Sequence, residues 1–140
     1  MAGITERLRD TNAIYFDGTT IPANTTTTSS RLLTTEGGNL GGMIVLVRAE
    51  AEITLADTKV MTLTVNDNAL VTGGTDTEVY TKTYTASGAD IVFAIGDTIA
   101  EFILPRTVLE FTSVTVATTD ALIAGTFDAF LSSPMGRTNV

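Results

Sequence analysis

The 140-residue sequence contains no cysteine and no histidine. The absence of cysteine excludes a disulfide framework, a thiolate nucleophile and a cysteine-ligated metal site. The absence of histidine removes the most common general base, the most common transition-metal ligand and the side chain that titrates near neutral pH. Tryptophan is also absent, so an aromatic platform for a sugar would have to come from tyrosine. We therefore expect no enzymatic activity and no cofactor.

Basic residues are scarce. Eight lysine and arginine residues stand against 16 aspartate and glutamate residues, which gives a formal net charge of −8. A surface that binds the phosphates of nucleic acid needs the opposite sign. The composition therefore predicts no direct contact with nucleic acid.

Long hydrophobic runs are missing as well. An apolar run such as residues 43–47 is far shorter than the ~20 residues that cross a bilayer. The first ten residues contain no apolar core of signal-peptide length. We expect no membrane partner, and the lack of cysteine suits assembly in a reducing cytoplasm.

Threonine, in contrast, is abundant, with 28 residues among 140 and only six serines. Threonine is β-branched, so it loses rotamer freedom in a helix and fits the pleated surface of a sheet. A chain that fills its polar positions with threonine is therefore expected to consist of strands. Two interpretations of the threonine surface remain open, an ordinary solvated sheet face or a face that lies against another protein.

The hydrophobic pattern predicts eight or nine short strands and no helix. Residues 59–65 and 77–85 alternate between apolar and polar side chains, and glycine, proline and asparagine clusters separate the apolar segments. The fold class is all-β, an antiparallel two-sheet β-sandwich, jelly-roll-like, with about eight strands. We expect an N-terminal arm over residues 1–12, the jelly-roll domain over 13–132 and a C-terminal tail over 133–140.

No catalytic set emerges from the polar residues. Without histidine or cysteine, Lys59 or Lys82 would have to activate a nucleophile, and both lie in alternating strand sequence. Glu101 and Glu110 flank a predicted turn and could face each other across a hairpin, as a glycosidase pair would. Isolated acidic residues on strands are normally solvated, which favours a non-enzymatic interpretation.

Metal and phosphate sites are not predicted either. Residues 66–68 resemble the opening of a calcium loop, but no glutamate follows at the required spacing, and turn chemistry explains them better. Glu50 and Glu52 share one predicted strand face and are a further pair of carboxylates, but acidic residues on strands are normally solvated. The glycine-rich segment 36–42 matches no phosphate-binding motif and is expected to be an inter-strand loop.

The order of these features is similar to that of a known family. A polar arm and a glycine-rich loop precede the apolar strand at 43–47, then come the strand and turn at 61–68, the segment at 77–81 and the strand at 125–130. Over about residues 30–132, this pattern resembles the jelly-roll capsid cement (decoration) proteins of tailed bacteriophages. The resemblance implies the same fold and no catalytic residues.

The resemblance also implies a role. A capsid cement protein binds the outer surface of the phage head, bridges copies of the major capsid protein and stabilises the shell. We therefore expect two partners, the major capsid protein and further copies of this chain, with a dimer favoured over a trimer. The expected location is the exterior of the capsid, after assembly in the cytoplasm of the bacterial host.

Capsid contacts are predicted at arginines and at aromatic side chains in segments of poor periodicity. Arginine is common in protein interfaces. The predicted contact residues are Arg7, Arg9, Tyr15, Phe16, Arg31, Arg48 and Arg106.

Two alternatives share this composition. A tail, fibre or other adhesive β-sandwich would have the same strands but occur in few copies per virion. A carbohydrate-binding jelly roll would need an aromatic platform, for which Tyr15, Tyr80 and Tyr84 are the candidates.

Overall fold

The structure, a computed structural model, describes residues 13–21, 23–33, 43–105, 107–119 and 125–132. These residues form strands and connections, and none of them lies in an α-helix. No helix in this part of the chain is long and apolar enough to cross a membrane. The predicted arm at 1–12, the predicted tail at 133–140 and the whole glycine-rich segment at 36–42 lie outside the described residues.

Eleven strands are present in the described part of the chain. They are β1 (Ile14–Thr20), β2 (Thr26–Thr28), β3 (Leu32–Leu33), β4 (Ile44–Ala49), β5 (Ile53–Leu55), β6 (Val60–Asn68), β7 (Thr77–Thr85), β8 (Ile91–Phe93), β9 (Thr98–Ile103), β10 (Phe111–Thr118) and β11 (Thr126–Ser132).

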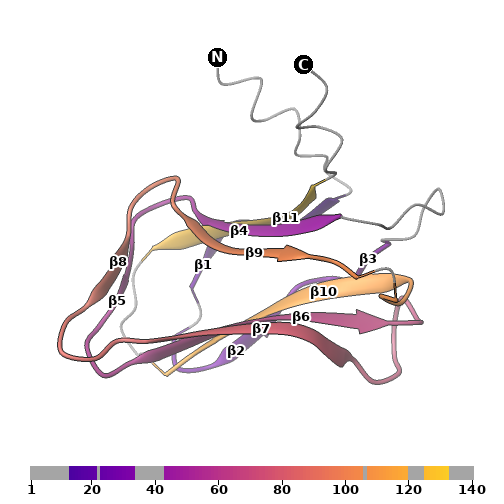
Figure 1. The fold of residues 1–140 in the computed structure, drawn as a ribbon, viewed down its shortest axis with the longest axis horizontal. Coiled ribbons are helices and arrows are strands. Elements are labelled where there is room, and N and C mark those ends of the chain that lie inside the picture. Colours follow the sequence, from indigo (N-terminus) through magenta and orange to yellow (C-terminus); the bar gives the residue numbers. More distant parts are fainter. Residues whose placement is uncertain (1–12, 22, 34–42, 106, 120–124, 133–140) are drawn as a thin grey trace, which may run out of the picture.

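Eight of these strands form two packed sheets (Figure 1). Sheet A has the order β1-β11-β4-β9 and sheet B the order β2-β10-β6-β7, while the short β3 also pairs with β10. Every described pairing is antiparallel. When these eight strands are numbered in chain order, sheet A reads first-eighth-third-sixth and sheet B reads second-seventh-fourth-fifth. This order is the double Greek key of a jelly roll. The predicted fold class is confirmed.

The core lies between the two sheets, and it follows from strand alternation. In β6, Met61, Leu63 and Val65 are at most 1% exposed, while the threonines between them are half-buried. In β4, Val45 and Val47 are fully buried and point at the same core. A small two-stranded sheet, formed by β5 and β8, closes one end of the sandwich (Figure 1), with Ile53 and Leu55 fully buried.

Aromatic contacts join the outer strands of the two sheets along one side. The ring of Tyr80 on β7 stacks on Phe102 of β9, with centroids 5.6 Å apart. Tyr84 donates a hydrogen bond to the carbonyl of Ile99 and packs edge-on against Phe93 at 5.1 Å. Lys82 places its ammonium 5.2 Å from the Tyr84 ring centroid. Lys82 is paired with the core residue Leu63 and so points to the inner side of the sheet, and the register of β7 against β6 shifts near Val65. Both features discourage another strand from pairing with β7 at this edge of sheet B.

Several sequence boundaries are corrected. The apolar run and the alternation over residues 43–54 predict a single strand, but the structure divides it into β4 and β5, because the chain bends at residues 50–52. Residues 66–68, expected in a turn, end strand β6. The turn dipeptide Asp17-Gly18 predicts the end of the first strand, but Gly18 lies inside β1 with a φ of 60°, where the register with β11 shifts.

The expected hairpin that would join Glu101 and Glu110 is absent from the described structure. Glu101 lies on β9 in sheet A, and Glu110 immediately precedes β10 in sheet B. β9 and β10 are not paired with each other. This separation removes the structural basis for a carboxylate pair across a hairpin.

Candidate functional site

The two predicted aromatic contact residues are core residues. Tyr15 is 6% exposed and Phe16 is 7% exposed, and the Phe16 ring packs against Phe127 with centroids 4.9 Å apart. Their side chains are not available at the surface of this chain, which corrects the prediction that they contact a partner. Their burial also removes Tyr15 from the candidate sugar platform.

Tyr15 instead links the two sheets. Its hydroxyl lies 2.6 Å from the hydroxyl of Thr112, so a residue of β1 is hydrogen-bonded to a residue of β10. Burial raises the pKa of the Tyr15 phenol well above its usual range, although the hydrogen bond acts in the opposite direction. The phenol is therefore a neutral structural group at physiological pH.

Arg31 holds the connection between β6 and β7. Its guanidinium donates to the carbonyls of Leu70 at 3.1 Å and Gly73 at 2.7 Å, and it forms an ion pair with Asp76 at 3.1 Å. The side chain is only 15% exposed. These contacts give Arg31 a structural task, and its capsid contact stays a prediction.

Arg48 has similar internal contacts. Its Nε lies 3.8 Å from the carboxylate of Asp128, and its guanidinium carbon lies 5.3 Å from the centroid of the Phe130 ring. The side chain is 22% exposed, and its role in binding also stays a prediction. The remaining predicted contacts, Arg7, Arg9 and Arg106, lie outside the described residues.

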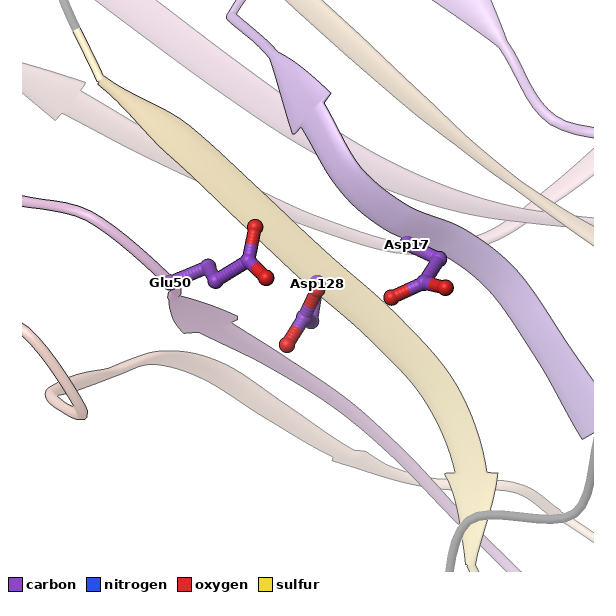
Figure 2. Close-up of side chains that lie close together, drawn as sticks. All are labelled: Asp17, Glu50 and Asp128. Atoms are coloured by element: carbon purple, nitrogen blue, oxygen red, sulfur yellow. The ribbon is translucent and has the colours of Figure 1, made fainter.

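Three acidic side chains meet on the outer face of sheet A. Figure 2 shows Asp17, Glu50 and Asp128 approaching one another from β1, the connection after β4, and β11. One oxygen from each carboxylate lies within 4.8 Å of the others. Oxygen atoms of this kind are ligands for hard cations such as Ca²⁺.

Contacts within the protein already account for this acidic group. The backbone N–H of Gly18 donates to Asp128 at 2.8 Å, and the hydroxyl of Thr126 donates to Glu50 at 3.3 Å. The nearby guanidinium of Arg48 offsets part of the negative charge. We interpret the group as a polar connection between β1, β11 and the end of β4.

A different feature covers the outer face of sheet B, where threonines align across four strands. Because directly paired residues of neighbouring strands point to the same face, the register defines two rows. The first row runs across β2, β10, β6 and β7, and the second runs beside it in the same strand order. The first row is Thr28, Thr115, Thr64 and Thr81, and the second is Thr26, Ala117, Thr62 and Thr83. We call these eight residues the threonine face.

The threonine face is accessible and carries no charge. Its four residues on β2 and β7 are exposed, and the four on β10 and β6 are half-buried. Beyond the first row the next paired positions are Ser113, Asn66 and Glu78, so this side of the face has a charge at one corner, on β7. In a chain with a net charge of −8, this is a neutral surface of hydroxyl and methyl groups.

Hydrogen bonds order the side chains of this face. The hydroxyl of Thr115 lies 3.0 Å from that of Thr28 and accepts from the amide of Asn66 at 2.9 Å. The hydroxyls of Thr62 and Thr83 lie 3.5 Å apart. One end of the face is hollowed into an open pocket of about 290 Å³, which Thr26, Thr62 and Ala117 help to line. Such a surface can accept a flat protein surface without desolvating a charged side chain.

Only part of this face can be predicted from the sequence. The alternation in β6 predicts that Thr62 and Thr64 point outward, but it does not predict which strands pair with β6. Thr28 and Thr115 are 87 residues apart in sequence and become neighbours only through the β2–β10 pairing. The repeated threonines at every second position in 26–28, 62–64 and 81–83 were the available signal.

The comparisons with known proteins leave the family open. No family model matches the chain, and no curated protein matches it. A similar solved structure bears the description "CBM4 structure and function", with 12% sequence identity and a TM-score of 0.42. The match covers 76% of this chain and 59% of the other protein, so it spans less than two thirds of that protein's length.

Proposed function

We propose that this protein is a capsid cement (decoration) protein of a tailed bacteriophage, which binds the exterior of the head through the threonine face. The observation that carries the proposal is an ordered, uncharged sheet face on a chain with a net charge of −8. The similarity of the sequence pattern to the cement proteins supplies the identity of the partner, the major capsid protein.

The physical properties of the threonine face suit this role. The centres of protein interfaces are depleted of charged residues, because each buried charge must lose its hydration. The rigid sheet below the face also reduces the conformational entropy that is lost on binding. A copy that bridges two or more capsid subunits binds more tightly overall, because its second contact forms at a high effective concentration once the first has formed.

The net charge and the capacity for symmetric assembly also suit this role. The acidic surface elsewhere keeps the protein soluble and disfavours contact with the DNA inside the head. A symmetric dimer would allow one decoration unit to span neighbouring capsid subunits. Arg7, Arg9, Arg31, Arg48 and Arg106 stay as predicted additional contacts around this unit.

The experiment that tests the proposal is binding of the purified protein to purified phage heads that lack it. We expect co-sedimentation that saturates at a simple ratio to the major capsid protein. Because the threonine face is neutral, raising the salt concentration from 0.1 to 0.5 M should change the dissociation constant by less than about threefold. A loss of binding at high salt would assign the contact to charged residues, and no binding at either concentration would contradict the proposal.

A further inference from the structure

The threonine face is regular except at one position, Ala117. Each of its two rows takes one residue from β2, β10, β6 and β7, and every residue except Ala117 is a threonine. Alanine lacks the hydroxyl and the methyl group that threonine carries on its β-carbon. The second row is therefore interrupted on β10, between Thr26 and Thr62, and the surface is hollowed at this point.

The next paired positions along the sheet form a further wall of this hollow. Thr119 on the β10 side and Val60 on β6 point to the same face as Ala117, because they lie two residues beyond the second row. The N–H of Thr119 donates to the carbonyl of Val60 at 3.0 Å, and the N–H of Val60 donates to the hydroxyl of Thr119 at 3.0 Å. The wall is thus bonded into sheet B. We call the pocket that these residues border around Ala117 the Ala117 hollow.

The chemistry of the Ala117 hollow favours an uncharged, apolar group. No charged side chain is among the described residues that line it. Ala117 and Val60 contribute only hydrocarbon side chains. The hydroxyl of Thr119 already accepts from a backbone N–H, and that of Thr62 lies 3.5 Å from the hydroxyl of Thr83. A charged group would lose its hydration here without gaining an ion pair, so the hollow suits an aliphatic group better.

The size of the hollow matches a single side chain. Pockets for small-molecule ligands usually measure about 300–1,000 Å³ and surround most of the ligand. The Ala117 hollow measures about 290 Å³ and is open to solvent. A side chain that projects from another protein needs no such enclosure, because its own backbone stays outside the pocket.

The interruption of the two rows also affects how a partner can dock. Neighbouring strands are about 4.8 Å apart and alternate residues of a strand about 6.7 Å apart, so a shift by one strand or one row places threonine where threonine was. The threonines alone therefore distinguish poorly between several positions of a flat partner. A side chain that enters the hollow fits in one position and clashes with a threonine in the others, which selects that position.

We infer that the Ala117 hollow receives one aliphatic side chain of the major capsid protein and thereby sets the position of the threonine face on the head. This inference rests on the proposed function, because the side chain belongs to the capsid partner. The surrounding threonines exclude water from the anchor, as the near-neutral contacts around a hot spot generally do. Asn24, exposed at the rim of the hollow, can bind the backbone of the capsid segment that carries the side chain.

Substitutions that fill the hollow test this inference. Ala117→Thr completes the second row with the residue type of its neighbours on β2 and β6, so the fold should be retained, which circular dichroism checks. We expect the dissociation constant for purified heads to rise at least about tenfold for Ala117→Thr, and further for Ala117→Leu. Ala117→Ser adds a single atom and should stay within about threefold of the natural protein. The matched control Ala94→Leu changes an exposed residue just after β8 and should bind like the natural protein.

Chemical protection is a second measurement, since the natural chain contains no cysteine. The thiol of Ala117→Cys should react with a maleimide in the free protein, and binding to heads should slow this reaction at least about tenfold, because a buried thiol is inaccessible. The thiol of Ala94→Cys should react at the same rate in both states. Mass spectrometry of this chain measures the labelled fraction.

Two results would overturn this inference alone. Binding of Ala117→Thr and Ala117→Leu at the affinity of the natural protein would mean that no side chain enters the hollow, while the natural protein still decorates heads. Unchanged labelling of Ala117→Cys on heads would lead to the same conclusion. If the natural protein does not bind heads at all, the proposed function fails, and this inference fails with it.

Discussion

Two negative charges at the centre of the threonine face, introduced as Thr64→Glu and Thr115→Glu, are expected to abolish binding to phage heads. These residues are paired across β6 and β10 and lie in the middle strands of the face. Burying an unpaired carboxylate costs several kcal/mol. Each 1.4 kcal/mol lowers affinity tenfold, so the dissociation constant should rise by at least about a hundredfold. Co-sedimentation with heads measures the change.

The control for this variant carries the same extra charge at a different place. Thr72→Glu combined with Thr75→Glu changes two exposed residues in the connection between β6 and β7. We expect this control to bind heads within about twofold of the natural protein, because a peripheral charge contributes little. Equal binding by both variants would remove the threonine face from the proposed contact, even if the protein still binds heads.

Replacement of Phe127 by alanine is expected to lower the free energy of unfolding by about 3–5 kcal/mol. Phe127 is completely buried, and its ring packs 4.9 Å from that of Phe16 between β11 and β1. The substitution leaves a cavity that the surrounding strands cannot fill. A domain of this size is typically stable by only 5–15 kcal/mol, so the loss is a large fraction of the total.

Urea denaturation followed by circular dichroism measures this change. The control is Ile95→Ala, which truncates a side chain that is 74% exposed and should alter stability by less than about 0.5 kcal/mol. A loss of less than 1 kcal/mol for Phe127→Ala would contradict the assignment of Phe127 to the core.

The alternating strands could be predicted from sequence because one face of each is buried. Residues 77–85 were expected as one strand, and β7 has these bounds. The break between β4 and β5 could not be predicted. The apolar alternation continues through residues 50–52, while the chain bends there and the N–H groups of Glu50 and Ala51 both donate to the carbonyl of Thr126.

The error at the start of β1 has a similar cause. Tyr15 and Phe16 are adjacent, and in a regular strand they would point to opposite faces. The register shift between Ile14 and Phe16 allows both side chains to be buried. Sequence periodicity does not reveal such a shift, so the sequence predicts a partner contact at these two aromatic residues and does not reveal that both are buried.

The threonine face required knowledge of strand pairing. The sequence predicts outward-facing threonines within a strand, but the two rows depend on strands that are distant in the chain. In a jelly roll, the partners of each strand follow from the topology of the whole domain. The composition therefore predicted a threonine-rich surface, and the fold determined where its residues gather.

The proposed decoration of the phage head is tested most directly by the copy number of this protein in purified virions. Quantitative mass spectrometry would compare this chain with the major capsid protein in the same particles. We expect a ratio of one to one or a simple fraction of it. A few copies per particle would instead support a tail or fibre module, and absence from the virion would contradict a structural role in the head.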